Sequence, residues 1–362
     1  MQKIEEIKDK RNYGIDLLRI LAGFYVIVLH AFGRGGVLEN LPEETISFRV
    51  VWMLEIISYS AVNIFVLISG FNSITEKERK NDWSGIICLW LEVVYYSVFV
   101  YIILSLVKGF TIRAESILGH LFPILNNGDY WFFSSYICLF SLKPIIDKGI
   151  RNTDALQMKI LIGIFFLFIS IYSVIRDPFF LILGPSPFWF VILYIIGAGI
   201  KKCQFDKKFS NIQLIVLLIV MILITWVSKC YGRTFYIFNH RIHDRTLISS
   251  YTSPTELVSA VLHVLIFSKL NIPAFLKKTI RFAAPSVFAI YLINTHPLYW
   301  NYELNNKFLA YAPRRISVLL PKIMIYSISF FCFAILIDKI RQFIFQKFQI
   351  REKIYKLLYT HK

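Results

Sequence analysis

Long apolar runs recur along this chain and leave it few ways to fold. Each has roughly the ~20 residues that a helix needs to cross the hydrocarbon core of a bilayer. Lipid offers no hydrogen-bond partners to the backbone, so runs of this length favour helices over open strands. The sequence therefore predicts an all-α, polytopic transmembrane bundle of about ten helices. The predicted helices lie near residues 14–33, 51–71, 84–107, 130–146, 158–175, 179–200, 211–229, 254–270, 283–300 and 316–338.

The composition agrees with a membrane protein and argues against a nucleic-acid-binding one. Of 362 residues, 56% are hydrophobic and only 17% are charged, which is too apolar for a soluble domain of this length. The formal net charge of +17 comes from Lys and Arg that lie between apolar runs, not on one polar face. We therefore expect membrane lipids, and no nucleic acid, as partners.

The basic residues also predict the orientation of the chain. If the N-terminus is cytoplasmic, the inner segments carry about twice as many Lys and Arg as the outer segments, as the positive-inside rule requires. Both termini are then cytoplasmic in a multi-pass protein of the inner (plasma) membrane. The outer segment 229–253 departs from the rule, because it is basic as well. We predict a transmembrane domain over residues 1–338 and a basic amphipathic cytoplasmic tail over residues 339–362.

The first apolar run carries the most informative polar residues. Within the segment Gly14 to Gly33, Asp16, Arg19 and His30 are costly to place in lipid. Arg19 and His30 are eleven positions apart, which is close to three helical turns and about 16 Å, so they share one helix face. Asp16 precedes Arg19 by one turn and can pair with it. The alternative is a stripe that only packs against polar neighbours.

Further polar residues lie in the next two apolar runs. Glu55 and Asn63 are eight residues apart in the second run, about two turns, and can face the same interior space as His30. Glu92 is a second candidate buried carboxylate, in the third run. Ser69 is small and lies near the end of the second run. For Glu55, Asn63 and Glu92, the competing interpretation is an interhelical hydrogen bond.

A family resemblance rests on these residues. An Arg and a His separated by ten residues, within the context D-L-L-R-x-L-A, resemble the opening motif of the membrane-bound acyltransferase-3 family. The family O-acylates carbohydrates, mostly cell-surface polysaccharides, and is thought to use cytoplasmic acyl-CoA. Three further matching segments spread the resemblance over nearly the whole chain: Val62 to Phe71, Tyr130 to Ile146 and Pro285 to Leu298.

The resemblance implies roles for individual residues. His30 is the expected base, or alternatively the carrier of a transient acyl group, while Arg19, held by Asp16, faces the donor. The predicted catalytic residues are His30, Arg19, Asp16 and Glu55. The predicted donor-binding residues are Arg19, Arg79, Lys80 and Ser69. The predicted acceptor-binding residues are Asn63, Tyr130, Trp131 and His296.

Two segments depart from the family pattern. The paired arginines that the family usually has at the start of the third span are replaced by the adjacent Arg79 and Lys80, which also suit a solvated loop. The usual His after Leu-Ile in the late segment is displaced by Asn294 and Thr295, which leaves His296. Tyr130 and Trp131 have an alternative role in an interfacial aromatic belt.

The sequence gives no support for a metal or a permanently bound cofactor. The five cysteines are scattered without a C-x-x-C pair, and His240 and His243 lack an evident further ligand. His120 and His263 suit structural hydrogen bonds. We therefore expect no metal, no resident cofactor, and acetyl-CoA (acyl-CoA) as a donor substrate.

The expected function is a membrane O-acyltransferase that moves an acetyl group from coenzyme A to a hydroxyl of a cell-surface polysaccharide or its lipid-linked precursor. The main alternative is a transporter or flippase for lipid-linked sugars, which would also need intramembrane charges. A third class, a polysaccharide polymerase, would typically have a longer catalytic outer loop. The sugar, the acyl chain and the oligomeric state stay open.

Overall fold

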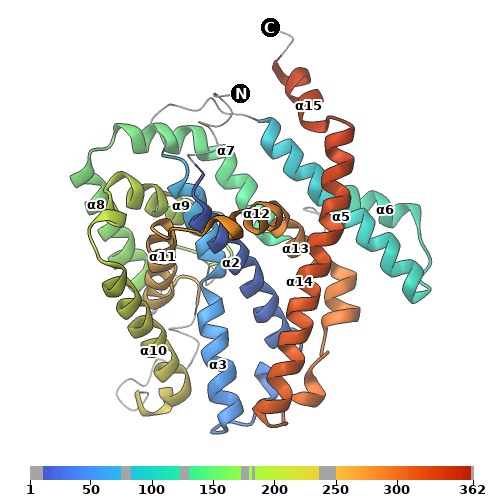
Figure 1. The fold of residues 1–362 in the computed structure, drawn as a ribbon, viewed down its shortest axis with the longest axis horizontal. Helices are drawn as coiled ribbons and strands as arrows, with labels where there is room; N and C mark the ends of the chain where they lie inside the picture. The colour runs from blue at the N-terminus through green and yellow to red at the C-terminus, as the bar shows by residue number, and fades with distance from the viewer. Residues whose placement is uncertain are drawn as a thin grey trace.

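The computed structural model describes residues 11–74, 83–122, 130–172, 179–181, 184–235 and 250–359, which form helices and no strand. This agrees with the predicted all-α class. The helices are α2 (Tyr13–Phe32), α3 (Ile46–Tyr59), α4 (Ala61–Phe71), α5 (Ser84–Lys108), α6 (Ala114–Leu121), α7 (Trp131–Asn152), α8 (Ala155–Ile164), α9 (Pro187–Lys202), α10 (Asn211–Phe235), α11 (Pro254–Ser268), α12 (Ala274–Ala283), α13 (Val287–Asn294), α14 (Ile316–Lys347) and α15 (Ile350–Tyr359). Figure 1 shows α15, the last described helix, at the upper end of the bundle.

Five helical segments of the described chain are long and apolar enough to cross a membrane. They are Tyr13–Phe32, Ile46–Phe71, Ser84–Lys108, Asn211–Tyr231 and Ile316–Lys347, and two shorter apolar helices cover Ala155–Ile171 and Pro254–Ser268. All ten predicted runs contain helix, but ten full-length spans are not confirmed. The run predicted over 283–300 is divided among α12, a 3₁₀ turn with Pro285 (Ala284–Ser286), α13 and a π-helical turn (Tyr299–Leu304). A proline inside the run favours this break, because it lacks a backbone N–H.

Helix α2 lies at the centre of the bundle. It packs against α3, α4, α11, α12, α13 and α14, which come from both halves of the chain. Its N-terminus is capped by Asn12, whose side-chain Oδ1 accepts the N–H of Ile15 at 3.0 Å. Such a cap satisfies one of the free N–H groups at a helix start. The surrounding helices keep the polar face of α2 in contact with protein.

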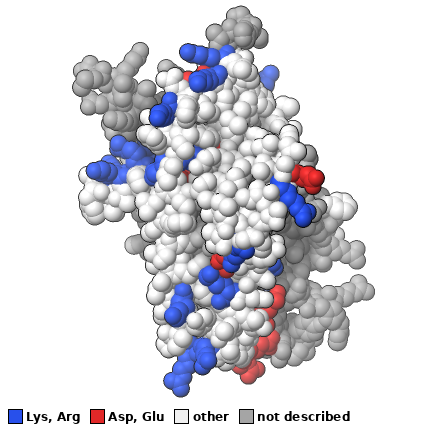
Figure 2. All heavy atoms as spheres, turned by 90° about the vertical axis from the view of Figure 1, so that its right-hand side faces the viewer, with Lys and Arg blue, Asp and Glu red and all other residues white. Residues whose placement is uncertain are grey.

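The outer surfaces of the bundle are apolar. Helix α10 exposes a row of large side chains that includes Ile212, Val216 and Ile219, and α14 exposes Ile325, Phe333 and Leu336. Figure 2 shows one face covered mostly by uncharged side chains, with Lys and Arg in small separate groups. Apolar surface of this extent suits contact with lipid tails.

Small residues bring α4 and α9 unusually close. A Cβ added at Gly70 would lie 2.0 Å from the backbone oxygen of Tyr194, and one at Gly197 would lie 2.2 Å from that of Leu67. Only glycine tolerates such an approach between backbones, as in many membrane helix pairs. This contact fixes α4, which carries Phe65 and Ser69, against the rest of the bundle.

The last long helix passes through the expected domain boundary at residue 338. Arg341 is buried between α14 and α5, where its Nη2 lies 3.4 Å from Glu92 Oε1 and its Nε donates to Asp338 Oδ1 at 2.7 Å. Gln342 donates to the hydroxyl of Ser286 at 3.0 Å. The beginning of the predicted tail therefore packs inside the bundle. Glu92 thus has an ion-pair partner on another helix, although its Oε1 makes no hydrogen bond within the described residues.

We predict that Gly70→Ala and Gly197→Ala each lower the free energy of unfolding by about 1 to 3 kcal/mol, because the new methyl group must displace a backbone. The measurement is thermal unfolding of detergent-solubilised protein. The control is Gly163→Ala, where an added Cβ meets no atom within 4 Å. Equal unfolding temperatures for all three variants would contradict the close α4–α9 contact.

Candidate active site

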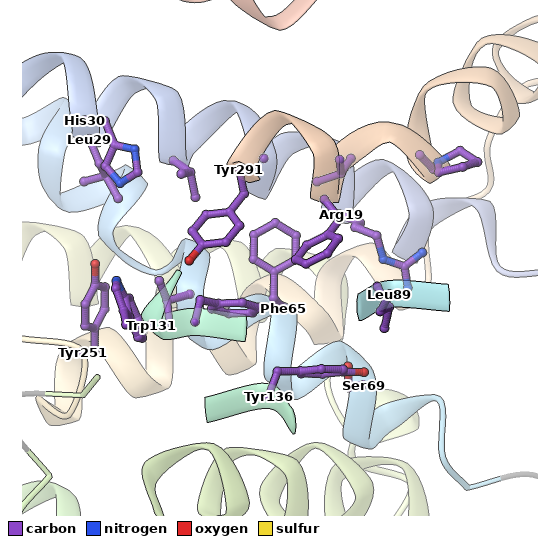
Figure 3. A pocket seen from close by; sticks show the side chains of 18 residues that line it. Arg19, Leu29, His30, Phe65, Ser69, Leu89, Trp131, Tyr136, Tyr251 and Tyr291 are labelled. Atoms are coloured by element: carbon purple, nitrogen blue, oxygen red, sulfur yellow. The ribbon is translucent and has the colours of Figure 1, made fainter. Parts of the chain in front are cut away.

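A cavity of about 330 Å³ lies along α2, and both Arg19 and His30 form part of its wall. Figure 3 shows the two side chains at opposite ends of this space. Their eleven-residue separation corresponds to about 16 Å along the helix axis. The cavity can therefore hold an elongated molecule with a guanidinium at one end and an imidazole at the other.

Aromatic side chains supply much of the remaining wall. Phe65 comes from α4, Trp131 and Tyr136 from α7, Tyr251 from the segment before α11, and Tyr291 from α13. Figure 3 shows Phe65 and Tyr291 between the two polar ends, and Trp131 and Tyr251 on the side of His30. Ser69 of α4 is also in the lining, on the side of Arg19. A mostly apolar wall with a few polar groups is typical of a small-molecule site.

A glycine allows the roof of the cavity to approach α2. Gly23 lines the cavity on α2, and a Cβ there would lie 2.7 Å from Cγ1 of Val287. Val287 begins α13, directly after the 3₁₀ turn that contains Pro285. The break in the predicted 283–300 span thus places α13 over the middle of the cavity.

The imidazole of His30 is held by two residues that are distant along the chain, Asn294 and Trp300. Its Nδ1 is hydrogen-bonded to Oδ1 of the buried Asn294, and its ring meets the edge of Trp300 at a centroid distance of 4.8 Å. An amide oxygen only accepts, so this contact requires the proton on Nδ1, and Nε2 of the neutral imidazole then keeps its lone pair. This tautomer leaves Nε2 as a proton acceptor.

The guanidinium of Arg19 is held by Asp16. Its Nη1 lies 2.9 Å from Asp16 Oδ1, which is the ion pair that the spacing predicts, and Arg11 Nε contacts the other carboxylate oxygen. The Asp16 side chain is 10% exposed and that of Arg19 is 34% exposed. Asp16 therefore holds Arg19 from inside the protein, while Arg19 keeps an open side toward a ligand.

The structure brings four of the predicted residues to this cavity or its wall: Arg19, His30, Ser69 and Trp131 line it, and Asp16 contacts Arg19. Three of the acceptor-binding predictions, Asn63, Tyr130 and His296, fall outside the lining. The Asn63 amide donates to the backbone oxygen of Tyr251 at 2.7 Å and accepts the indole N–H of Trp189 at 3.0 Å. Asn63 thus positions a cavity wall, because both ends of its amide are engaged by protein.

Tyr130 and His296, together with Glu55, lie away from the cavity lining. His296 is buried, with Nε2 at 3.0 Å from the backbone oxygen of Ser97 and its ring stacked on His120. Tyr130 is buried in a left-handed conformation before α7, with its ring near that of Tyr291. Glu55 lies on α3 within electrostatic range of Glu256 and Lys229. The structure does not place these three side chains in contact with the cavity.

Arg79, Lys80, His240 and His243 lie outside the described residues, so their roles stay predictions. Within the described chain, no group of three His, Cys, Asp or Glu residues is arranged to hold a metal ion. The main residues that the sequence did not single out for the site are Asn294 as a contact of His30, Trp300, Tyr251 and Phe65. No sequence spacing indicates these contacts, since they join segments that are distant along the chain.

Comparison with known proteins gives one result that bears on this site. The sequence model of the acyltransferase domain of the acyltransferase-3 type matches residues 12–339. The match begins at the cap of α2 and ends within α14, so it includes every residue of the cavity. No curated protein and no solved structure matches the chain.

We predict that Asp16→Asn lowers the free energy of unfolding by about 1 kcal/mol, because it removes the carboxylate charge that two partly exposed guanidinium groups share. Unfolding in detergent at low salt measures this loss, which is expected to shrink at high salt. The control is Asp206→Asn, whose carboxylate lies 3.9 Å from Lys201 Nζ. A larger loss in the control than in Asp16→Asn would contradict the role given to Asp16.

Proposed function

We propose that this chain, which belongs to the acyltransferase-3 family over residues 12–339, moves an acetyl group from acetyl-CoA to a hydroxyl of a cell-surface polysaccharide or its lipid-linked precursor. Family membership makes it a membrane acyltransferase. The donor and acceptor are our proposal. The observation that carries it is one cavity with the Nε2 of an oriented imidazole at one end and a guanidinium at the other.

The reaction follows from the tautomer of His30. Nε2 takes the proton of the acceptor hydroxyl as its oxygen attacks the thioester carbonyl carbon. The carbon–sulfur bond then breaks, and the departing sulfur of coenzyme A receives the proton from the imidazolium. The products are the O-acetyl ester and free coenzyme A. In the alternative use of His30, Nε2 itself carries the acetyl group before the hydroxyl attacks.

The other end of the cavity suits the donor. Arg19 stays charged when buried and can bind oxygen atoms of the donor through its fork of N–H groups. The aromatic rings that line the cavity suit the flexible arm that carries the thioester and exclude water from it. Ser69, near Arg19, offers a hydroxyl to the same arm.

The proposed path crosses the membrane along α2. Helix α2 begins nearer the end of the bundle where α15 lies, and it descends from there in Figure 1. If this end is cytoplasmic, as the basic segments predict, the donor enters beside Arg19 and the acceptor meets His30 from the outer side. We therefore propose the inner or plasma membrane as the location.

We predict that His30→Ala lowers kcat for acetyl transfer by about 10² to 10⁴, the usual contribution of a general base. The measurements are release of the coenzyme A thiol by purified protein and the O-acetyl content of surface glycans in cells. The control is His263→Leu, a buried His in α11 that does not line the cavity. Unchanged transfer in His30→Ala would contradict the role of His30 as the base. If the parent protein is instead a sugar carrier, it will show neither thiol release nor acetyl transfer.

We predict that Asn294 acts as a positioning residue for His30. Asn294→Leu keeps the side-chain size but removes the acceptor for Nδ1–H, and we expect kcat to fall about tenfold or more with little change in KM. Asn294→Asp keeps an acceptor oxygen and is expected to restore part of the lost kcat. Equal losses in both variants, or a loss confined to KM, would contradict this role.

A further inference from the structure

Three cations converge on the ring of Tyr13, the first residue of α2. The guanidinium carbons of Arg11 and Arg281 lie 5.6 and 6.0 Å from the ring centroid, and Lys277 Nζ lies 5.4 Å from it. Arg281 also donates to the Tyr13 hydroxyl at 2.8 Å. We call these four residues the Tyr13 cluster.

Helix α12 presents two of these cations together. Lys277 and Arg281 are four positions apart, so they lie on one face of α12, while Ile280 and Ala283 are buried on another. Pro273 immediately precedes α12. The basic side chains of α12 are half-buried or exposed. The neighbouring Lys278 is exposed and points about 100° away around the axis.

The Tyr13 cluster has more positive than negative charge. Among the residues that the structure describes, Asp16 is the only carboxylate paired with a member of the cluster, and it also pairs with Arg19. Cation–π contacts at exposed sites stabilise by only about 0.5 to 1 kcal/mol each, which does little against repulsion among neighbouring cations. This arrangement favours an anion of high charge.

The cluster connects directly to the cavity. Asp16 bridges Arg11 of the cluster and Arg19 of the cavity wall. On the other side, α12 leads within a few residues to Ala284 and Pro285, which line the cavity. In Figure 1 α12 lies beside the beginning of α2, and the two helices are in contact. An elongated ligand can thus occupy the cavity and the cluster at once.

The geometry points to the Tyr13 cluster as the binding site for the phosphorylated nucleotide end of a coenzyme A thioester whose arm occupies the cavity. This inference rests on the proposed function for the identity of the donor. The nucleotide end carries a diphosphate and a 3′-phosphate, and two guanidinium groups and an ammonium suit these oxygen atoms. The cluster adds three cations to the predicted donor-binding residues, which are Arg19, Arg79, Lys80 and Ser69.

The test compares two donors in nanodiscs of neutral lipid. For the double variant Lys277→Ala/Arg281→Ala, we expect KM for acetyl-CoA to rise about tenfold or more with kcat unchanged, because two charged contacts are lost. KM for acetyl-pantetheine, which lacks the nucleotide, is expected to stay the same. The matched control is Lys278→Ala, on the same helix but outside the cluster, with both KM values unchanged. An unchanged KM for acetyl-CoA in the double variant would overturn the inference and leave the acyl transfer standing.

A binding measurement separates this inference from the proposed function. Adenosine 3′,5′-diphosphate, titrated into the parent protein by calorimetry, is expected to bind and to lose affinity in the double variant, without any turnover. Such binding in a protein that transfers no acetyl group would keep the phosphate site and remove the acyl transfer. Phosphates could also come from lipid headgroups. An effect of the double variant that appears only with anionic lipid, equally for both donors, would assign the cluster to lipid and overturn the inference.

Discussion

The burial of a charged helix face against protein is the constraint on which the rest of this structure depends. Arg19 and His30 cannot face hydrocarbon without a large loss of solvation, so α2 must be surrounded on its polar side. Helices from both halves of the chain supply that environment, and Asn12, Asp16 and Asn294 satisfy specific polar atoms of α2. The cavity exists because these helices enclose α2 without filling the space beside it.

The site is assembled from segments that are far apart in sequence. The partner of His30 is 264 residues away, and the wall residue Tyr251 is fixed by Asn63, which is 188 residues away. Two further contacts support the cavity from outside it: Gln342 holds Ser286, next to Pro285, and Trp189 holds Asn63. Substitutions well outside the cavity can therefore alter its shape.

The helical period was enough to predict the wall formed by Arg19 and His30 and the pairing of Arg19 with Asp16, because both depend only on spacing within one helix. Predictions that needed contacts between helices did not place their residues in the cavity lining. Glu55 and Asn63 were assigned from their spacing along one apolar run, and His296 from a family pattern, and neither determines which neighbouring helix a side chain meets. The single span predicted over 283–300 is divided among short helical segments, because Pro285 interrupts the run. The sequence indicated Asn294 only as a departure from a family pattern and did not indicate its contact with His30.

The length of α14 has a genetic consequence. Its 32 residues correspond to about 48 Å, more than the about 30 Å of a hydrocarbon core, and its last turns lie beyond the predicted span 316–338. These turns carry Arg341 and Gln342, which neutralise Glu92 and anchor the turn at Ser286. A nonsense or frameshift allele after residue 338 would spare every apolar run and still leave a stranded carboxylate in the bundle. A stop codon at this point of α14 therefore acts as a core lesion, because it removes the contacts of Arg341 and Gln342.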